Sequence, residues 1–254
     1  MHHLVALYLY LIFNLGTSIL MESLTFDQII NLIIAFVSLL LTIFLLTKKT
    51  KHALANTLLA LFLLVNAQDS SGMLASYFVY PSFPGWGMVI NSTVFFKFPL
   101  LYMYLQAVIY SDFKLRRAQL WHFIPWVLNF IVFIPRYYAV DFDTKWEFLN
   151  QIVNRESFEI RYSYISLHLQ IVIYLIMSLA LVKKYRILLL ENFSNANMMN
   201  YRWLFQLVIL YGIESMVATF KNIFMFLKIE EAYNYTYMAT TLFALGFVCW
   251  LVLK

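Results

Sequence analysis

The stretch IINLIIAFVSLLLTIFLLTKKTK, Ile29–Lys51, decides the fold. Its apolar part is long enough to cross a hydrocarbon core as an α-helix, and lysines follow it directly. Further apolar runs of the same kind come later in the chain: Ala53–Tyr77, Thr93–Tyr110, Leu120–Ile134, Tyr162–Val182, Trp203–Leu227 and Tyr233–Leu253. The sequence therefore predicts an all-α membrane protein built as a seven-transmembrane helix bundle.

The cations fall mostly in every second gap between these runs. The first, third and fifth gaps hold Lys48, Lys49 and Lys51, then Lys114, Arg116 and Arg117, then Lys183, Lys184, Arg186 and Arg202. The other gaps and the amino-terminal segment carry most of the acidic residues. Because short basic loops stay in the cytoplasm, we expect the amino-terminal segment outside and Lys254 inside. This pattern favours a multi-pass membrane protein with a cytoplasmic carboxyl end and with membrane lipids as its first partners.

The composition excludes most other classes. Hydrophobic residues make up 63% of the chain and charged residues 12%, which leaves too little polar surface for a soluble domain of 30.1 kDa. The runs are too long and too apolar on all sides for the strands of a membrane β-barrel. The pI of about 9.1 follows from loop cations beside the membrane, and no residues that would read nucleic acid are recognised.

Residues 1–21 form a hydrophobic leader or extra helix, and residues 22–254 form the seven-span membrane domain. Three interpretations of the leader stay open. Met21 could be the natural start, Met1–Leu20 could be an additional span or an interfacial helix, or the leader could be a signal peptide, although it has no basic residue near its start. In the loop between the fourth and fifth runs, a short amphipathic helix is expected around Trp146–Val153.

Ionisable residues inside membrane spans are costly and therefore point to function. We identify Asp69, Lys97, His168 and Glu214. At 1.5 Å per residue, Asp69 and Lys97 both lie roughly 20 Å above the cytoplasmic edge, while His168 and Glu214 both lie near the midplane. We expect an Asp69–Lys97 ion pair with a Glu214–His168 hydrogen bond beneath it. The alternatives are that Lys97 reaches the outer interface and that His168 binds a backbone carbonyl.

These four residues would line one outward-opening cavity, together with the polar side chains Asn66, Gln68, Tyr102 and Tyr211. A small polar or amphipathic ligand would suit such a cavity. The histidines do not show a metal-ligand spacing, and the sequence has no catalytic signature of a metalloprotease, serine hydrolase or phosphate-binding loop. We therefore expect neither a metal nor a cofactor, and no enzymatic activity.

The stretch FKFPLLYMYLQAVIYSDFKLRRAQLWHFIPWVLNFIVFIP, Phe96–Pro135, resembles the membrane-embedded AraC-type transcription regulators of Bacteroidota. His122-Phe-Ile-Pro125 carries most of the likeness. In that family a seven-span domain precedes a cytoplasmic helix-turn-helix domain, and residues up to Lys254 contain no such module. Pro125 fits the first turn of a helix, and His122 is expected at the cytoplasmic edge, capping carbonyls or meeting anionic headgroups.

The resemblance implies a membrane-embedded sensor that passes an external or membrane cue to a cytoplasmic output domain or partner protein. Nucleic acid would not be contacted by this chain itself, and a second copy of the chain is an alternative partner. The rival interpretation is a small-solute transporter or channel subunit that uses Asp69, Lys97 and Glu214 along its path. Solute flux in proteoliposomes that is sensitive to Asp69→Asn would favour the transporter, whereas a change in gene expression on deletion without any flux would favour the sensor.

Overall fold

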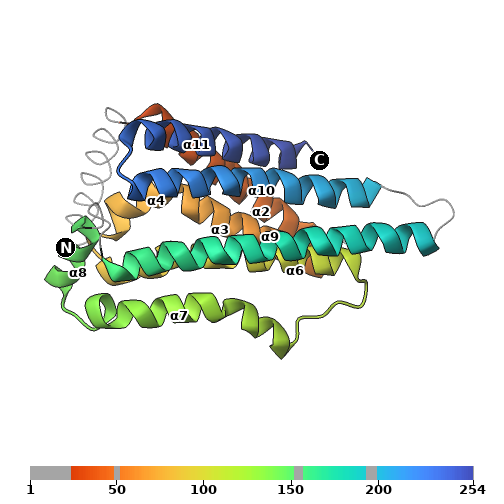
Figure 1. Ribbon diagram of the computed structural model, residues 1–254, viewed down its shortest axis with the longest axis horizontal. Helices are drawn as coiled ribbons and strands as arrows, with labels where there is room; N and C mark the ends of the chain where they lie inside the picture. The colour runs from red at the N-terminus through yellow and green to blue at the C-terminus, as the bar shows by residue number, and fades with distance from the viewer. Residues whose placement is uncertain (1–23, 49–51, 152–156, 193–198, 254) are drawn as a thin grey trace, which may run out of the picture.

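A computed structural model describes residues 24–48, 52–151, 157–192 and 199–253. The predictions for the leader, residues 1–21, lie outside this part of the chain. The described residues are helical apart from short connections. The long helices are α2 (Phe26–Thr47), α3 (Ala53–Ser70), α6 (Lys97–Ile109), α7 (Ile124–Phe133), α9 (Phe158–Asn192), α10 (Met199–Phe226) and α11 (Glu230–Val252). They run side by side along the longest axis of the molecule (Figure 1).

Short helical segments extend or join the long ones. They are α4 (Gly72–Leu74), the π-helix η1 (Ala75–Val79), α5 (Pro84–Ser92), the 3₁₀-helices η2 (Thr93–Phe96) and η3 (Arg117–Phe123), the π-helix η4 (Ile134–Tyr138) and α8 (Phe142–Gln151). Through η2, helices α5 and α6 form one continuous helical stretch that starts with Pro84, a residue whose fixed φ and missing N–H suit a first helical turn.

Six helical stretches among the described residues are long and apolar enough to span a membrane. They are Phe26–Thr47, Pro84–Ile109, Arg117–Tyr138, Phe158–Glu191, Asn200–Phe226 and Glu230–Val252. Large apolar side chains such as Phe36, Ile165 and Ile176 point away from the bundle and are more than half exposed, as expected of surfaces that face lipid. The chain is therefore a multi-pass, all-helical membrane protein.

Helix α3 is the apolar stretch that does not meet the composition of a span. Its last turns carry Asn66, Gln68, Asp69 and Ser70, which lower its mean hydropathy. Nevertheless α3 packs against both α2 and α6, and one face of it, from Ala55 to Ala67, is buried in the protein while Leu61 and Leu64 are exposed. Polar residues are tolerated in a membrane helix where they contact other helices.

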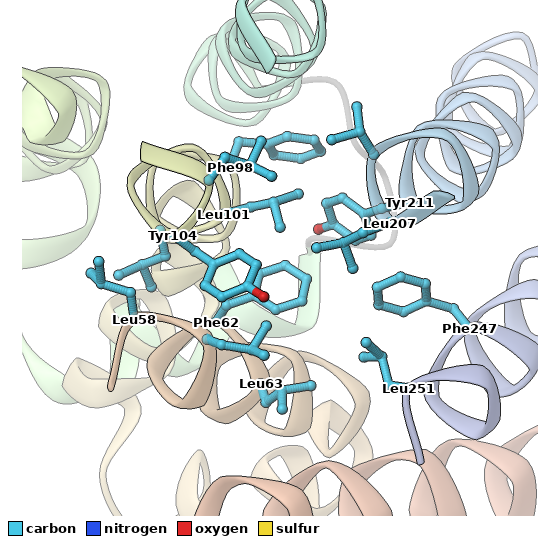
Figure 2. Packing of buried hydrophobic residues seen from close by; sticks show 14 of the residues in the cluster. Leu58, Phe62, Leu63, Phe98, Leu101, Tyr104, Leu207, Tyr211, Phe247 and Leu251 are labelled. Atoms are coloured by element: carbon cyan, nitrogen blue, oxygen red, sulfur yellow. The ribbon is translucent and has the colours of Figure 1, made fainter. Parts of the chain in front are cut away.

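A large apolar core joins α3, α6, α10 and α11 in the half of the bundle that contains the α2–α3 and α9–α10 connections (Figure 2). Phe62 lies at its centre and is fully buried. The Phe62 ring packs edge-on against Tyr211, with centroids 5.1 Å apart, and against Phe247 at 6.3 Å. Leu101 and Leu207 fill the space around it, so this half of the bundle is closed by side-chain packing.

A smaller apolar cluster lies toward the opposite end and consists of Met88, Phe133, Tyr137 and Ile160. Helix α8 lies across this end of the bundle (Figure 1), with Phe148 packed edge-on against Phe133 at 6.2 Å. The Tyr137 hydroxyl donates a hydrogen bond to the carbonyl of Pro84. The predicted amphipathic helix is confirmed, and it begins earlier than expected, at Phe142.

Candidate functional site

The centre of the site is the predicted ion pair. Asp69 lies in the last turn of α3 and Lys97 at the first residue of α6, and Nζ of Lys97 lies 2.6 Å from Oδ2 of Asp69. The Lys97 side chain is buried, with 8% of its surface accessible, whereas half of the Asp69 side chain is accessible. A buried ammonium needs such a partner, because an isolated charge in a low-dielectric interior is unstable.

The alternative in which Lys97 reaches the outer interface is wrong, because Lys97 is buried against Asp69 and lies far from the start of its helix. The helical stretch containing Lys97 starts at Pro84 and not near Thr93. Lys97 therefore lies roughly 20 Å from the start of that stretch at 1.5 Å per residue, which is too deep for its side chain to reach the headgroups.

A cavity of about 380 Å³ lies next to this pair. Asp69, Lys97, His168, Glu214 and Tyr211 all line it, so the structure brings together the four ionisable residues identified in the sequence and one of the predicted tyrosines. The remaining lining residues come mainly from α5, α7, α9 and α10, and include Asn91, Ser92, Asn129, Ser163, Tyr164, Ser215, Lys221 and Asn222. The cavity thus combines polar groups with apolar walls, as small-molecule sites do.

His168 uses both ring nitrogens within the wall of the cavity. Nδ1 lies 3.1 Å from Oγ1 of Thr219, and Nε2 lies 3.1 Å from Nδ2 of Asn222. Thr219 donates its own hydroxyl hydrogen to the carbonyl of Ser215, so it must accept from Nδ1–H. Asn222 donates to Nε2. This pattern describes a neutral imidazole with its proton on Nδ1.

The predicted Glu214–His168 hydrogen bond is therefore wrong, as is a His168 bond to a backbone carbonyl. Helix α9 begins at Phe158, ahead of the predicted Tyr162, so His168 lies level with Thr219 and Asn222. These partners are roughly 7 to 12 Å further along α10 than Glu214. A small error in the start of one helix thus moved the pairing by one to two turns.

Glu214 faces the cavity without a hydrogen bond or ion pair among the described residues. Lys97 and Lys221 are both close enough to interact electrostatically with its carboxylate. The ammonium of Lys221 itself lies over the ring of Tyr237 on α11, 5.7 Å from the centroid. Glu214 is thus the charged group of the cavity that the surrounding helices leave available.

Three of the predicted site residues lie elsewhere. Nδ2 of Asn66 donates to Oγ of Ser38, 3.4 Å away, between α3 and α2. Gln68 accepts a hydrogen bond from the Thr93 hydroxyl. Tyr102 lies in the middle of α6 and packs against the rings of His122 and Tyr174. These side chains connect helices to each other, so their prediction as cavity residues is wrong.

Several residues of the cavity were not identified from the sequence, and two of them bear on its chemistry. Lys221 lies within the predicted apolar run Trp203–Leu227, and the rule that found the four ionisable site residues should have found it as well. Asn129 of α7 is 4% exposed, and its Oδ1 has no hydrogen-bond partner among the described residues. A single amide in an apolar helix is a weak sequence signal, and only its unpaired oxygen makes it informative.

His122 also differs from its predicted role at the membrane edge. It is half-buried in η3, and its Nδ1 lies 2.5 Å from the hydroxyl of Tyr174 on α9. The rings of Tyr102 and Tyr174 surround it at centroid distances of 5.9 and 5.7 Å. His122 therefore joins the start of α7 to α6 and α9.

The site as a whole offers fixed charges, hydrogen-bonding groups and aromatic walls around a cavity, which is the chemistry of ligand binding. Among the described residues no group of three or more His, Cys, Asp or Glu is placed to hold a metal ion. No family model matches the sequence, and comparisons with curated proteins and with solved structures find no match.

Proposed function

We propose that this chain is a seven-span membrane sensor domain that binds a small ligand in the cavity beside Asp69 and Lys97. The proposal rests on one observation: charged or titratable side chains from four helices, α3, α6, α9 and α10, line the same cavity. Such residues are costly in a membrane helix, and their common position favours a binding site. The likeness of Phe96–Pro135 to AraC-type regulators supports an output in transcription control.

The seventh span in this proposal is α3. Its 18 residues measure about 27 Å, close to the ~30 Å hydrocarbon core. It packs against α2 and α6, and its polar end is held by the contacts of Asp69 with Lys97 and of Gln68 with Thr93. With α3 counted as a span, consecutive connections fall at alternate ends of the bundle (Figure 1).

The proposed orientation follows from charge. Lys48, Lys114, Lys183 and Arg202 belong to the end with the α9–α10 connection, whereas Glu230 and Glu231 belong to the end with α8. Short basic connections favour the cytoplasm. The cavity then lies between the midplane and the outer face, and the carboxyl end of α11 faces the cytoplasm of a bacterial inner membrane.

A sensor fits the geometry better than the rival transporter. A permeation path must continue through both halves of the bundle, but the half opposite the cavity is filled by the core around Phe62, Leu101 and Leu207. Among the residues that the structure describes, the fully buried packing there leaves no polar route. A packed core suits the transmission of small helix shifts from a ligand site to the far end.

Helix α9 is the natural output element. Its 35 residues measure roughly 50 Å, well beyond the ~30 Å core, and it extends past its neighbours at the basic end (Figure 1). It carries His168 and Ile171 in the cavity wall and Tyr174 in contact with His122. A rearrangement of the cavity would therefore reach a cytoplasmic partner or output domain through α9 and α10.

Spin labels at Lys184 and Arg202, in a Cys249→Ser background, test this coupling in lipid nanodiscs. We expect Asp69→Asn to shift the distance distribution between the labels, because it disturbs the pair that joins α3 to α6. Asp112→Asn, in an exposed loop, is the matched control and should leave the distances unchanged. An unchanged distribution for Asp69→Asn, or a solute flux in proteoliposomes that this variant abolishes, would contradict the sensor proposal.

A further inference from the structure

The cavity contains buried or charged acceptors that lack hydrogen-bond donors. Glu214 has no partner among the described residues, and the buried Oδ1 of Asn129 also has none. Asp69 binds Lys97 through Oδ2, while its Oδ1 has no partner in the described part of the chain. The Asn129 oxygen is buried and has lost the hydrogen bonds that water would supply, so a ligand that donates hydrogen bonds would stabilise it. The same donors can bind the carboxylate oxygens of Glu214 and Asp69 that the described residues leave unpaired.

The charged groups of the cavity also favour a ligand that donates hydrogen bonds. Asp69 and Lys97 neutralise each other at 2.6 Å, and the hydrogen bonds of His168 describe a neutral ring. The Lys221 ammonium is placed over the Tyr237 ring. Lys97 and Lys221 both act electrostatically on Glu214, but among the described residues neither forms an ion pair with its carboxylate. Glu214 can therefore accept a direct contact from a ligand, and a carboxylate in a low-dielectric site favours a cation.

Aromatic and apolar side chains complete the lining. Phe98, Phe133, Tyr164 and Tyr211 face the same cavity as Glu214. Aromatic ring faces attract organic cations and also bury apolar carbon, so they suit an amine that carries a hydrocarbon body. The volume of about 380 Å³ lies at the small end of the range for ligand sites and limits that body to a compact group.

We infer that the cavity recognises a protonated amine with a compact apolar body, with Glu214 as the counter-ion and Asn129 as a second acceptor. This inference rests on the proposed function and specifies its ligand. The ammonium has two sources in a membrane: a soluble amine, or the ethanolamine headgroup of a phospholipid. Both present the same donors to Glu214 and Asn129.

The first test titrates the purified protein, in phosphatidylcholine nanodiscs, with 2-phenylethylamine and follows the thermal unfolding midpoint. Two probes of similar shape are compared, the alcohol 2-phenylethanol and the anion 3-phenylpropanoate. We expect saturable stabilisation by the amine, with an apparent affinity at least about tenfold above that of either analogue. Equal affinity for all three probes, or no effect of the amine in any lipid, would overturn the inference.

Substitutions of cavity residues test whether the amine binds at Glu214 and Asn129. Glu214→Gln should weaken amine binding by about tenfold or more, whereas Glu231→Gln, an exposed glutamate at the start of α11, should not change it. Asn129→Leu should weaken binding severalfold and also raise the unfolding midpoint without ligand, because it removes a buried unpaired oxygen. Amine binding that is unchanged in Glu214→Gln would overturn the inference.

Phosphatidylethanolamine in the nanodiscs separates the two sources. If the headgroup is the ligand, this lipid raises the unfolding midpoint, competes with phenylethylamine, and loses both effects in Glu214→Gln. If the ligand is a soluble amine, the lipid leaves the titration unchanged. Tight binding of the alcohol or the carboxylate that still shifts the label distances at Lys184 and Arg202 would refute the amine and leave the sensor proposal intact.

Discussion

The Asp69–Lys97 pair allows one prediction with a worked magnitude. At 2.6 Å and an effective dielectric of about 20, the attraction between the charges is about 6 kcal/mol before desolvation is subtracted. Lys97 is almost fully removed from solvent, but half of the Asp69 side chain is accessible. Breaking this pair should therefore destabilise the protein less than breaking a fully buried pair would. We therefore expect Asp69→Asn to destabilise the protein by about 2–3 kcal/mol, since it leaves the buried ammonium without a counter-ion.

The assay is a double-mutant cycle with Lys97→Met, measured by equilibrium unfolding in mixed micelles with increasing dodecyl sulfate. The double variant should be less destabilised than the sum of the single ones, with a coupling energy of about 1–3 kcal/mol. Asp112→Asn, in an exposed loop, should stay within about 0.5 kcal/mol of the original protein. Additive effects, or an Asp69→Asn variant as stable as the control, would refute the reasoning.

Three further predictions concern other parts of the bundle. His122→Phe removes the contact with the Tyr174 hydroxyl and should cost about 1 kcal/mol in the same unfolding assay, with no loss in a Tyr174→Phe background. Phe62→Ala should cost about 3–5 kcal/mol, and a loss below 1 kcal/mol would show that the core is not packed as described. The third concerns pH. Hydrogen bonds from the Thr144 side chain and backbone lower the pKa of Asp141 in the folded protein below its usual 3.8. The ionised Asp141 therefore stabilises α8 fully above pH 3.8, and this stabilisation is lost as the pH falls through the lowered pKa of the folded state. Protection factors of α8 amides should therefore drop only in this acidic window, and Asp141→Ala should remove the dependence.

The sequence predicted the helices well because lipid imposes a strong and simple constraint. Apolar runs such as the predicted Ile29–Thr47 must be helical, since a membrane offers no other partners for backbone groups, and the structure has this helix at Phe26–Thr47. The same constraint made the four ionisable residues conspicuous, and they do line one cavity. Helix starts were less well predicted, because the extension of the third helical stretch back to Pro84 depends on packing at the outer end and not on hydropathy.

Partner choice inside the bundle could not be derived from depth alone. His168 binds Thr219 and Asn222 because a shift of a few residues in the start of α9 changes which turn of α10 it faces. Asn66 illustrates a second difficulty. It lies close to Asp69 in the sequence, but its side chain does not face the same cavity and is hydrogen-bonded to Ser38 of α2. Helical phase decides between these directions, and short apolar sequence does not define phase to within one residue.

The central claim, which belongs to the proposed function, is that a ligand reaches the polar cavity from the outer face of the membrane and that the packed core around Phe62 separates the cavity from the other face. Its most direct test is the reaction of Ala218→Cys, in a Cys249→Ser background, with a membrane-impermeant trimethylammonium methanethiosulfonate applied to either side of proteoliposomes. Ala218 lines the cavity, whereas Leu207 lies fully buried in the core and Leu207→Cys is the matched control. We predict that position 218 reacts only from the side on which a cysteine at Lys145 is labelled, and that position 207 does not react. Reaction of position 218 from both sides, or from neither, would contradict the account.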